Sequence, residues 1–222
     1  MISEEIRRIH EALPSGVRLV AVSKYHPSEA IREAYAAGQR VFGESHAQEL
    51  QRKHQELADL DLEWHFIGHL QTNKIKYIAP YVHLIHAVDS AHLLSEINKQ
   101  AVKIRRTIPC LLQLHVAQEE TKFGFTPDEA RRFLEEGTWC TMEGIEIVGI
   151  MAMATNTDDT TRIREDFHQA RHFFEETRKD FFHESSSFCE LSMGMSDDWH
   201  IAIDEGSTLI RIGTQIFGQR QY

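Results

Sequence analysis

The residue with the clearest chemical role to consider is Lys24, which lies at the end of an apolar segment over residues 17–25. The length and aliphatic content of this segment, bounded by residues 14–16 and by Pro27, predict a buried β-strand. An ammonium group at the end of such a strand is costly to bury unless it is paired or neutral. The amine either extends into water along its aliphatic stem or, with its pKa lowered by burial, forms a Schiff base with an aldehyde.

Two clusters of small and hydroxyl-bearing residues lie near the end of the chain, at positions 191–196 and 212–214. Ser192 and Thr214 supply hydroxyl groups, and the glycines allow a backbone to approach a ligand closely. Each cluster alone is equally consistent with an ordinary turn. Because the two clusters follow successive predicted strands, together they favour a phosphate site built from hydroxyls and backbone N–H groups.

Arg211 stands in the last apolar segment, where a strand period of two places it on the same face as Leu209 and Gly213. If that face points inward, a permanently charged donor enters the site. Arg211 could then bind a phosphate, pair with a carboxylate such as Glu44 or Asp89, or donate to a ring nitrogen. A structural ion pair is the alternative.

The chain contains 14 histidines, so a metal site has to be considered. His65 and His69 are four residues apart, which places both on one face if they share a strand. No cysteine or carboxylate stands at a recognisable ligand spacing, and we therefore predict no metal. A further group of histidines is interpreted as surface or partly buried: residues 83, 86, 168, 172 and 183.

The elements that must position these residues alternate regularly along the chain. After an amphipathic helix over residues 3–13, short apolar segments predict eight strands, each followed by a turn, and seven helical stretches separate them. The predicted strands are residues 17–25, 39–45, 62–68, 82–88, 109–116, 145–154, 188–193 and 208–217. This order predicts a single (β/α)8 TIM barrel with an extra N-terminal helix, as one domain over residues 1–222. An open doubly wound sheet is the alternative, but the glycine-rich first turn common in that fold is missing after Lys24.

Active sites of such barrels lie at the C-terminal ends of the strands. The chemically unusual residues of this chain gather at those predicted ends: Lys24, Glu44, Ser45, His46, His65, His69, Asp89, His115, Met151, Met153, residues 192–196, Arg211, Gly213 and Thr214. Polar residues are common at strand ends, so the coincidence supports a site without proving one.

Composition limits the possible partners and compartments. A net charge of −10 argues against nucleic acid, and no apolar stretch approaches the length of a membrane span. Residues 1–5 do not resemble a secretory signal. Three widely spaced cysteines fit reduced thiols better than disulfides, and we expect a cytoplasmic protein.

Several long motifs stand in a fixed order along nearly the whole chain: residues 21–24 (AVSK), 64–74 (WHFIGHLQTNK), 122–124 (KFG), 149–153 (GIMAM), 191–198 (LSMGMSDD) and 211–218 (RIGTQIFG). In these motifs the chain resembles the YggS/PROSC-type family of pyridoxal-phosphate homeostasis proteins. The resemblance implies a barrel like the N-terminal domain of alanine racemase that holds pyridoxal 5′-phosphate (PLP) as a Schiff base on Lys24. It further implies that Arg211 faces the pyridine nitrogen and that Ser192, Gly213 and Thr214 bind the phosphate. The full set of candidate cofactor-binding residues is Lys24, Ser45, His65, Ser192, Met193, Gly194, Arg211, Gly213 and Thr214.

The sequence departs from the family at Ser45-His46, where Asn-Tyr is common, so the contact beside the cofactor differs. Two functions remain open: a PLP carrier and a racemase-like enzyme. Racemases of this fold take a second base from a tyrosine on an added β-domain of the partner subunit. This chain ends at Tyr222, soon after the last predicted strand. An arginine beside the pyridine nitrogen also weakens the ring as an electron sink. We therefore expect a monomeric protein of PLP storage and delivery, with apo PLP-dependent enzymes as possible recipients.

Overall fold

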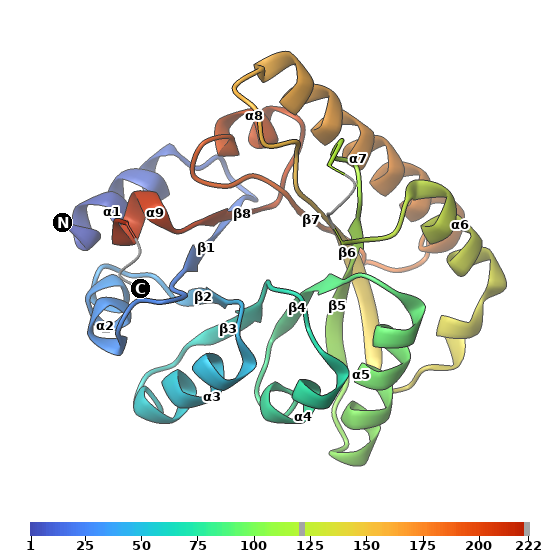
Figure 1. The fold of residues 1–222 in the computed structure, drawn as a ribbon, viewed down its shortest axis with the longest axis horizontal. Coiled ribbons are helices and arrows are strands. Elements are labelled where there is room, and N and C mark those ends of the chain that lie inside the picture. Colours follow the sequence, from blue (N-terminus) through green and yellow to red (C-terminus); the bar gives the residue numbers. More distant parts are fainter. Residues whose placement is uncertain (120–122, 220–222) are drawn as a thin grey trace.

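In the computed structural model, which describes residues 1–119 and 123–219, eight parallel strands close into a barrel in chain order (Figure 1). The strands are β1 (Arg18–Val22), β2 (Val41–Glu44), β3 (Glu63–Phe66), β4 (Leu84–Val88), β5 (Ile108–Leu114), β6 (Ile145–Ala152), β7 (Glu190–Ser192) and β8 (Leu209–Ile212). The ring closes where β1 pairs with β8, with Val20 opposite Arg211. The predicted (β/α)8 barrel is confirmed, and the open sheet is excluded.

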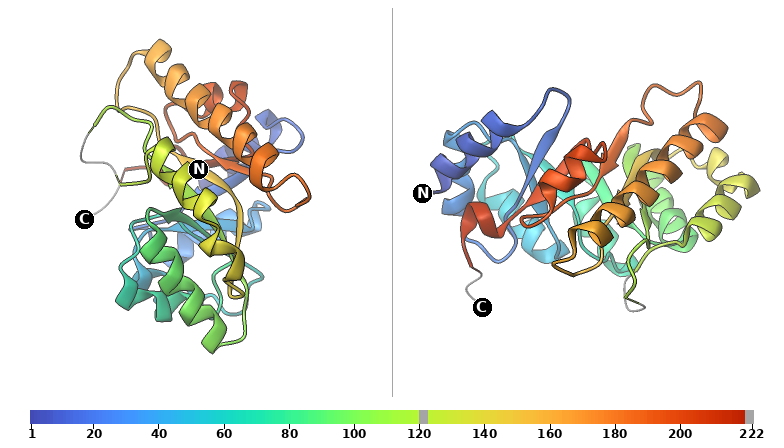
Figure 2. Two further views of the ribbon diagram at one scale, coloured as in Figure 1. Left: turned by 90° about the vertical axis from the view of Figure 1, so that its right-hand side faces the viewer. Right: turned by 90° about the horizontal axis from the view of Figure 1, so that it is seen from above.

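Helices follow the strands around the outside of the barrel (Figures 1 and 2). They are α1 (Ile2–Ala12), α2 (Ser28–Ala36), α3 (Ala47–Glu56), α4 (Ile75–Ile78), α5 (Ala91–Lys103), α6 (Pro127–Glu136), α7 (Thr160–Phe181), α8 (Trp199–Asp204) and α9 (Thr214–Phe217), with short 3₁₀ turns η1 (Thr72–Lys74) and η2 (Thr138–Thr141). The predicted extra helix is α1, which packs against α2 and α9.

Local sequence signals explain where several helices begin and end. Thr126 caps α6 in a reciprocal arrangement with Glu129, and Pro127 takes the first helical position, where a missing N–H costs little. The helix ends at Gly137, whose φ of 66° suits glycine. Ser90 caps α5 by accepting a hydrogen bond from the backbone N–H of Leu93.

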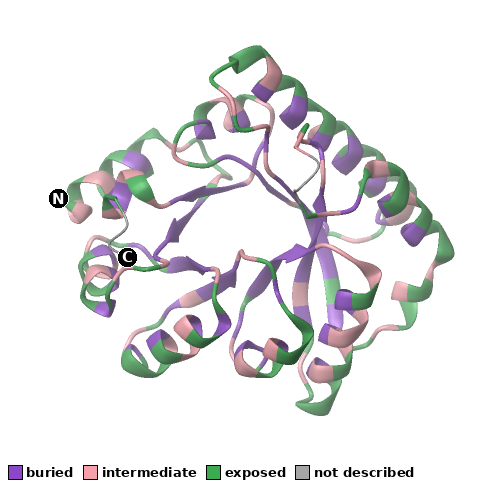
Figure 3. Cartoon of the chain, viewed as in Figure 1, coloured by how far each residue is buried: buried purple, intermediate pink, exposed green. Residues whose placement is uncertain are grey.

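The buried apolar side chains form two clusters, one between the barrel and the helices and one inside the barrel. The strands of the barrel are largely buried (Figure 3). The inner cluster consists of Val20, Val41, Leu84, Ala87, Leu111, Val148, Met151 and Leu209. These side chains fill the barrel, as in other barrels of this size, so the interior is a packed core and no pore runs through it. Any site must therefore lie at one end of the barrel.

Three of the predicted strands extend beyond the C-terminal ends of the observed strands near the site. Strand β1 ends at Val22, so Lys24 lies in the following turn, and β3 ends at Phe66, so His69 does not share its strand with His65. The predicted strand 208–217 is wrong beyond Ile212. The N–H groups of Ile216 and Phe217 both donate to the Gly213 carbonyl, which forms α9. A short apolar run cannot by itself distinguish a buried strand from a buried helical turn.

Among the described residues, none of the helices combines the length and the apolar composition needed to cross a bilayer.

Candidate ligand site at the barrel mouth

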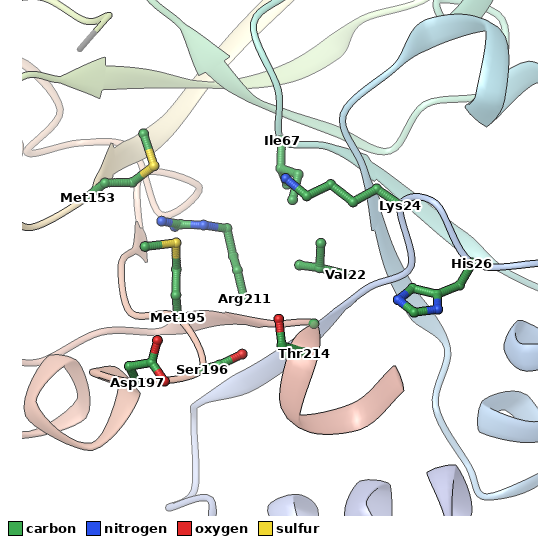
Figure 4. Close-up of a pocket in the computed structure, with 11 residues that line it drawn as sticks. Val22, Lys24, His26, Ile67, Met153, Met195, Ser196, Asp197, Arg211 and Thr214 are labelled. Atoms are coloured by element: carbon green, nitrogen blue, oxygen red, sulfur yellow. The ribbon is translucent and has the colours of Figure 1, made fainter. Parts of the chain in front are cut away.

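A cavity of about 240 Å³ opens at the C-terminal ends of the strands, between the residues that follow β1, β7 and β8 (Figure 4). Its lining includes the polar side chains of Lys24, His26, Ser196, Asp197, Arg211 and Thr214. In Figure 4, the Lys24 side chain extends into the cavity from one side, while Ser196 and Thr214 lie near one another on another side. A single cavity therefore holds an amine, a guanidinium group and two hydroxyls.

Lys24 is carried by a tight turn immediately after β1. The N–H of His26 donates to the Ser23 carbonyl at 3.1 Å, which closes the turn around Lys24 and Tyr25. Tyr25 has a φ of 66°, a left-handed conformation that is unusual for a residue with a side chain. This reversal directs the chain from the barrel wall toward α2, and Lys24 stands at its apex.

Arg211 is buried within the barrel beneath the cavity, on the same face as Leu209, as its strand period predicts. Its Nη1 donates to Ser192 Oγ at 2.6 Å and its Nη2 donates to the Ala152 carbonyl at 3.0 Å. Burial lowers the pKa of Arg211 to about 10, against an opposing effect of the Asp198 carboxylate, so the guanidinium keeps its charge at neutral pH. Of the two carboxylates considered as its partners, Glu44 is bound to Lys53 and Asp89 lies against His69.

A chain of buried hydrogen bonds continues from Arg211 through the barrel. Ser192 Oγ lies 2.9 Å from His86 Nδ1, and His86 Nε2 lies 2.9 Å from His65 Nδ1. Because arginine only donates, Ser192 Oγ accepts from Arg211, which leaves the Ser192 hydroxyl proton free to point at His86 Nδ1. In that arrangement His86 carries its proton on Nε2 and donates to Nδ1 of His65. The chain thereby orients Arg211 from below.

Burial lowers the pKa of His65 from 6.5 to about 3. In the unfolded chain a histidine takes up a proton near pH 6.5, whereas folded His65 stays neutral, so stability is lost as pH falls from 6.5 toward 3. We expect His65 alone to cost about 2 kcal/mol of unfolding free energy between pH 7 and pH 5. Glu44 has the opposite effect on the pH dependence of stability. Burial raises its pKa from 4.5 to about 7, so its contribution to stability increases as pH falls from 7 toward 4.5.

Comparing wild type with a His65→Gln variant isolates this effect, because glutamine can still accept a hydrogen bond from His86. Urea unfolding at both pH values should show the variant losing about 2 kcal/mol less than wild type on acidification. Equal losses in the two proteins would contradict the assignment of a neutral, buried His65.

Two glycines of the predicted phosphate clusters lie in close-packed surroundings. A Cβ added at Gly194, where φ is 97°, would lie 2.6 Å from the Ala202 side chain. A Cβ at Gly213 would lie 3.1 Å from the Val22 carbonyl oxygen. The loop after β7 is held by Asp198, whose Oδ1 accepts a hydrogen bond from the Met195 N–H at 2.5 Å. These contacts bring the loops after β7 and β8 to the same side of the cavity.

The structure brings together some of the predicted site residues and separates others. Lys24, Arg211, Gly213 and Thr214 line the cavity, and Ser192 lies directly below it on Arg211. His65 and Met193 are buried and do not line the cavity. Ser45 lines a neighbouring groove together with Tyr25, His46, His69 and Lys74. Lys122, quoted above as part of a motif, lies outside the described residues.

Sequence reasoning missed two participants in this region. His26, in the turn after Lys24, lines the cavity and was not considered. His86 was interpreted as a surface or partly buried residue, which is wrong, because it is fully buried. The signal was available, since His86 stands two residues after Leu84 in an apolar strand, and a period of two gives it the inward face of Leu84.

The chain is therefore a parallel (β/α)8 barrel with a cavity at its C-terminal mouth. The chain belongs to the pyridoxal phosphate homeostasis proteins, within the family described as alanine racemase, N-terminal domain, which it matches over residues 1–221. It is 38% identical to the pyridoxal phosphate homeostasis protein of Aquifex aeolicus, over 100% of this chain and 96% of that protein. The corresponding protein of Pasteurella multocida is 37% identical, over 94% of this chain and 88% of that protein.

The chain is also similar to solved structures. The structure of PipY from Synechococcus elongatus with PLP bound is 39% identical, with a TM-score of 0.89 over 98% of this chain and 100% of that chain. The alanine racemase of E. faecalis shares the fold at 18% identity, with a TM-score of 0.69, and this chain covers 57% of it.

Proposed function

We propose that this chain binds PLP in the mouth cavity and acts in PLP homeostasis, by storing and delivering the cofactor. The observation that carries the proposal is the presence of Lys24 and Arg211 in one cavity with the hydroxyls of Ser196 and Thr214. The solved PipY structure with PLP bound, at 39% identity over nearly the whole chain, supports it. The aldehyde of PLP forms a Schiff base with a lysine amine, and this chemistry is the cofactor's own.

The groups present fit the chemistry of PLP. Lys24 would supply the amine. The hydroxyls of Thr214 and Ser196 would contact the phosphate, together with the backbone at Gly213, where the chain passes close to Val22. Arg211, held by Ser192 and the Ala152 carbonyl, presents a permanent donor suited to an unprotonated ring nitrogen. Ser192 then acts by holding Arg211 in place, and Ser45 lies outside this set.

Absorbance spectroscopy and borohydride reduction test the proposal directly. The purified protein, saturated with PLP, is expected to be yellow, and borohydride is expected to remove the colour and fix a pyridoxyl mass on the peptide that contains Lys24. A label found mainly on other lysines would contradict the proposed site.

Thr214→Val tests the phosphate contact, because valine keeps the shape of threonine but removes its hydroxyl. We expect the affinity for PLP to fall about tenfold, as for the loss of one charge-assisted hydrogen bond, while pyridoxal without the phosphate binds as before. Titration of both ligands by fluorescence measures the two affinities. Equal losses for the two ligands would assign Thr214 to general packing of the cavity and not to the phosphate.

We further infer that the bound cofactor does not turn over amino acids at an enzymatic rate. Racemisation needs a base on each face of the reacting carbon. Lys24 can serve one face, but His46 and His69 line the neighbouring groove and His65 is held by His86. His26 is the histidine that lines the cavity itself, and its ring packs against Phe217 with 5.2 Å between centroids.

Incubation of the PLP-loaded protein with L- and D-alanine in D₂O, followed by NMR, measures exchange at Cα. We expect exchange close to that of free PLP, whereas an enzyme would exceed the rate of free PLP by several orders of magnitude. Fast exchange that is lost in His26→Ala would make this protein an enzyme with His26 as its second base.

A further inference from the structure

Three charged side chains that the proposed site does not use lie behind the turn that carries Lys24. Lys53, on α3, is completely buried, and its Nζ lies 2.7 Å from Oε1 of the equally buried Glu44 at the end of β2. The same ammonium lies 2.8 Å from Glu49 Oε1, one turn earlier on α3. Ser23 Oγ donates to Glu44 Oε1 at 2.7 Å, which joins this cluster to the turn.

The cluster holds both peptide groups that flank Lys24. Lys53 Nζ donates to the Ser23 carbonyl, immediately before Lys24, at 2.7 Å. The backbone N–H of Tyr25, immediately after Lys24, donates to Glu49 Oε1 at 2.7 Å. The direction in which the Lys24 side chain leaves the backbone is therefore fixed from the far side of the turn by α3.

Stability does not explain why such a cluster is present. Burying an ammonium and two carboxylates is expensive, and apolar side chains of similar volume often stabilise a protein as well or better. Glu44 illustrates the cost, since its Oε2 is buried with no hydrogen-bond partner among the described residues and burial raises its pKa to about 7 despite Lys53. The left-handed conformation of Tyr25 is a second cost that surrounding contacts must offset. Costly features held by many contacts are typical of positions where geometry serves function.

We propose that Lys53 and Glu49 are positioning residues that hold the Lys24 turn in the conformation that presents the amine to an aldehyde. This inference rests on the proposed attachment of PLP to Lys24. It assigns to α3 a role in the reactivity of the site, although α3 does not line the cavity. The cluster acts on the amine alone, so it should affect ligands that react with Lys24 and leave phosphate recognition unchanged.

Glu49 offers the mildest test, because its side chain is partly exposed and its Oε1 is the acceptor for both the Tyr25 N–H and the Lys53 ammonium. Glu49→Ala removes the acceptor for the Tyr25 N–H, whereas Glu49→Gln keeps an oxygen there. We expect Glu49→Ala to lower PLP affinity about tenfold, a loss typical of a small misplacement of a reacting group, and Glu49→Gln to restore most of it. Pyridoxine 5′-phosphate, which has the ring and phosphate but no aldehyde, should bind both variants within about twofold of wild type.

Lys53→Met should act in the same direction, and Arg52→Met is its matched control. Arg52 is the preceding residue on α3 and pairs with Glu56 at 2.8 Å, away from the turn. Circular dichroism reports whether each variant folds, and if Lys53→Met does not fold, the Glu49 pair decides alone. Unchanged PLP affinity in Glu49→Ala, or equal losses for PLP and pyridoxine 5′-phosphate, would overturn the proposal.

A measurement without cofactor separates this inference from the proposed function. Trace acetylation of the apo-protein, read peptide by peptide, gives the reactivity of Lys24 relative to Lys99, an exposed lysine on α5. We expect Glu49→Ala to change this ratio at least about threefold and Arg52→Met to leave it unchanged. If wild type binds PLP no better than pyridoxine 5′-phosphate, the proposed attachment fails, and the acetylation ratio still decides whether Glu49 and Lys53 position Lys24.

Discussion

Lys24→Ala is expected to abolish covalent attachment of PLP while leaving the barrel folded. Lys24 lies in a turn at the barrel mouth, so its truncation removes the amine without opening a cavity in the core. The phosphate and ring contacts remain, and the variant should therefore still bind PLP, about a hundredfold more weakly, which corresponds to about 2.7 kcal/mol. Intact mass after borohydride reduction shows whether a pyridoxyl group is retained, and absorbance shows whether the protein is yellow.

Lys74→Ala is the matched control, because Lys74 is a lysine of the neighbouring groove and does not line the cavity. It should be labelled as wild type is. If Lys24→Ala remains yellow and is labelled as fully as wild type, the amine that reacts with PLP is a different one and the proposed site is wrong.

Gly149→Ala is expected to lower the free energy of unfolding strongly, although it adds only one methyl group. Gly149 lies in β6 opposite Glu190 of β7, and a Cβ there would stand 1.8 Å from the Glu190 carbonyl oxygen. That clash is with backbone, so relief requires β6 and β7 to separate where Ser192 is anchored. We expect a loss of at least about 3 kcal/mol, which lowers Tm by about 6–12 °C in a chain of this size.

Gly137→Ala provides the comparison for Gly149→Ala. Gly137 ends α6 with a φ of 66°, and a Cβ there would meet nothing within 4 Å. The Gly137→Ala variant should lose only the free energy that alanine needs to adopt a left-handed conformation, about 1 kcal/mol. Thermal unfolding by circular dichroism ranks the two variants. A Gly149→Ala protein as stable as Gly137→Ala would contradict the close pairing of β6 with β7 at Gly149.

The fold follows from the sequence because each local signal is strong and all of them agree. Apolar segments of strand length alternate with amphipathic helices, and caps such as Thr126-Pro127 mark the boundaries. Parallel strands must end at one face, so the sequence order alone places Lys24, the loop at 191–196 and Gly213-Thr214 near one another. Family motifs then indicated PLP, and the family assignment is confirmed by the relatives.

Only the tertiary structure could decide which polar residues share one cavity. Ser45 and His65 both stand at predicted strand ends, yet one lies in a neighbouring groove and the other is buried against His86. The residue at which each strand ends determines where such side chains point, because a shift of one residue turns a side chain to the opposite face. Short apolar runs such as 208–217 do not define that end, because periodicity is ambiguous over a few residues.

The cluster behind the Lys24 turn was likewise invisible in the sequence. Lys53 and Glu49 look like ordinary charges at i, i+4 on a polar helix, a pattern that usually marks a solvated face. Packing of α3 against β2 buries Lys53 completely and Glu49 partly. It brings Lys53 against Ser23, 30 residues earlier in the chain, and Glu49 against Tyr25, 24 residues earlier. Sequence determines which groups are available. The distances between residues far apart in the chain, and the burial that sets the strength of their interactions, are fixed only when the barrel closes.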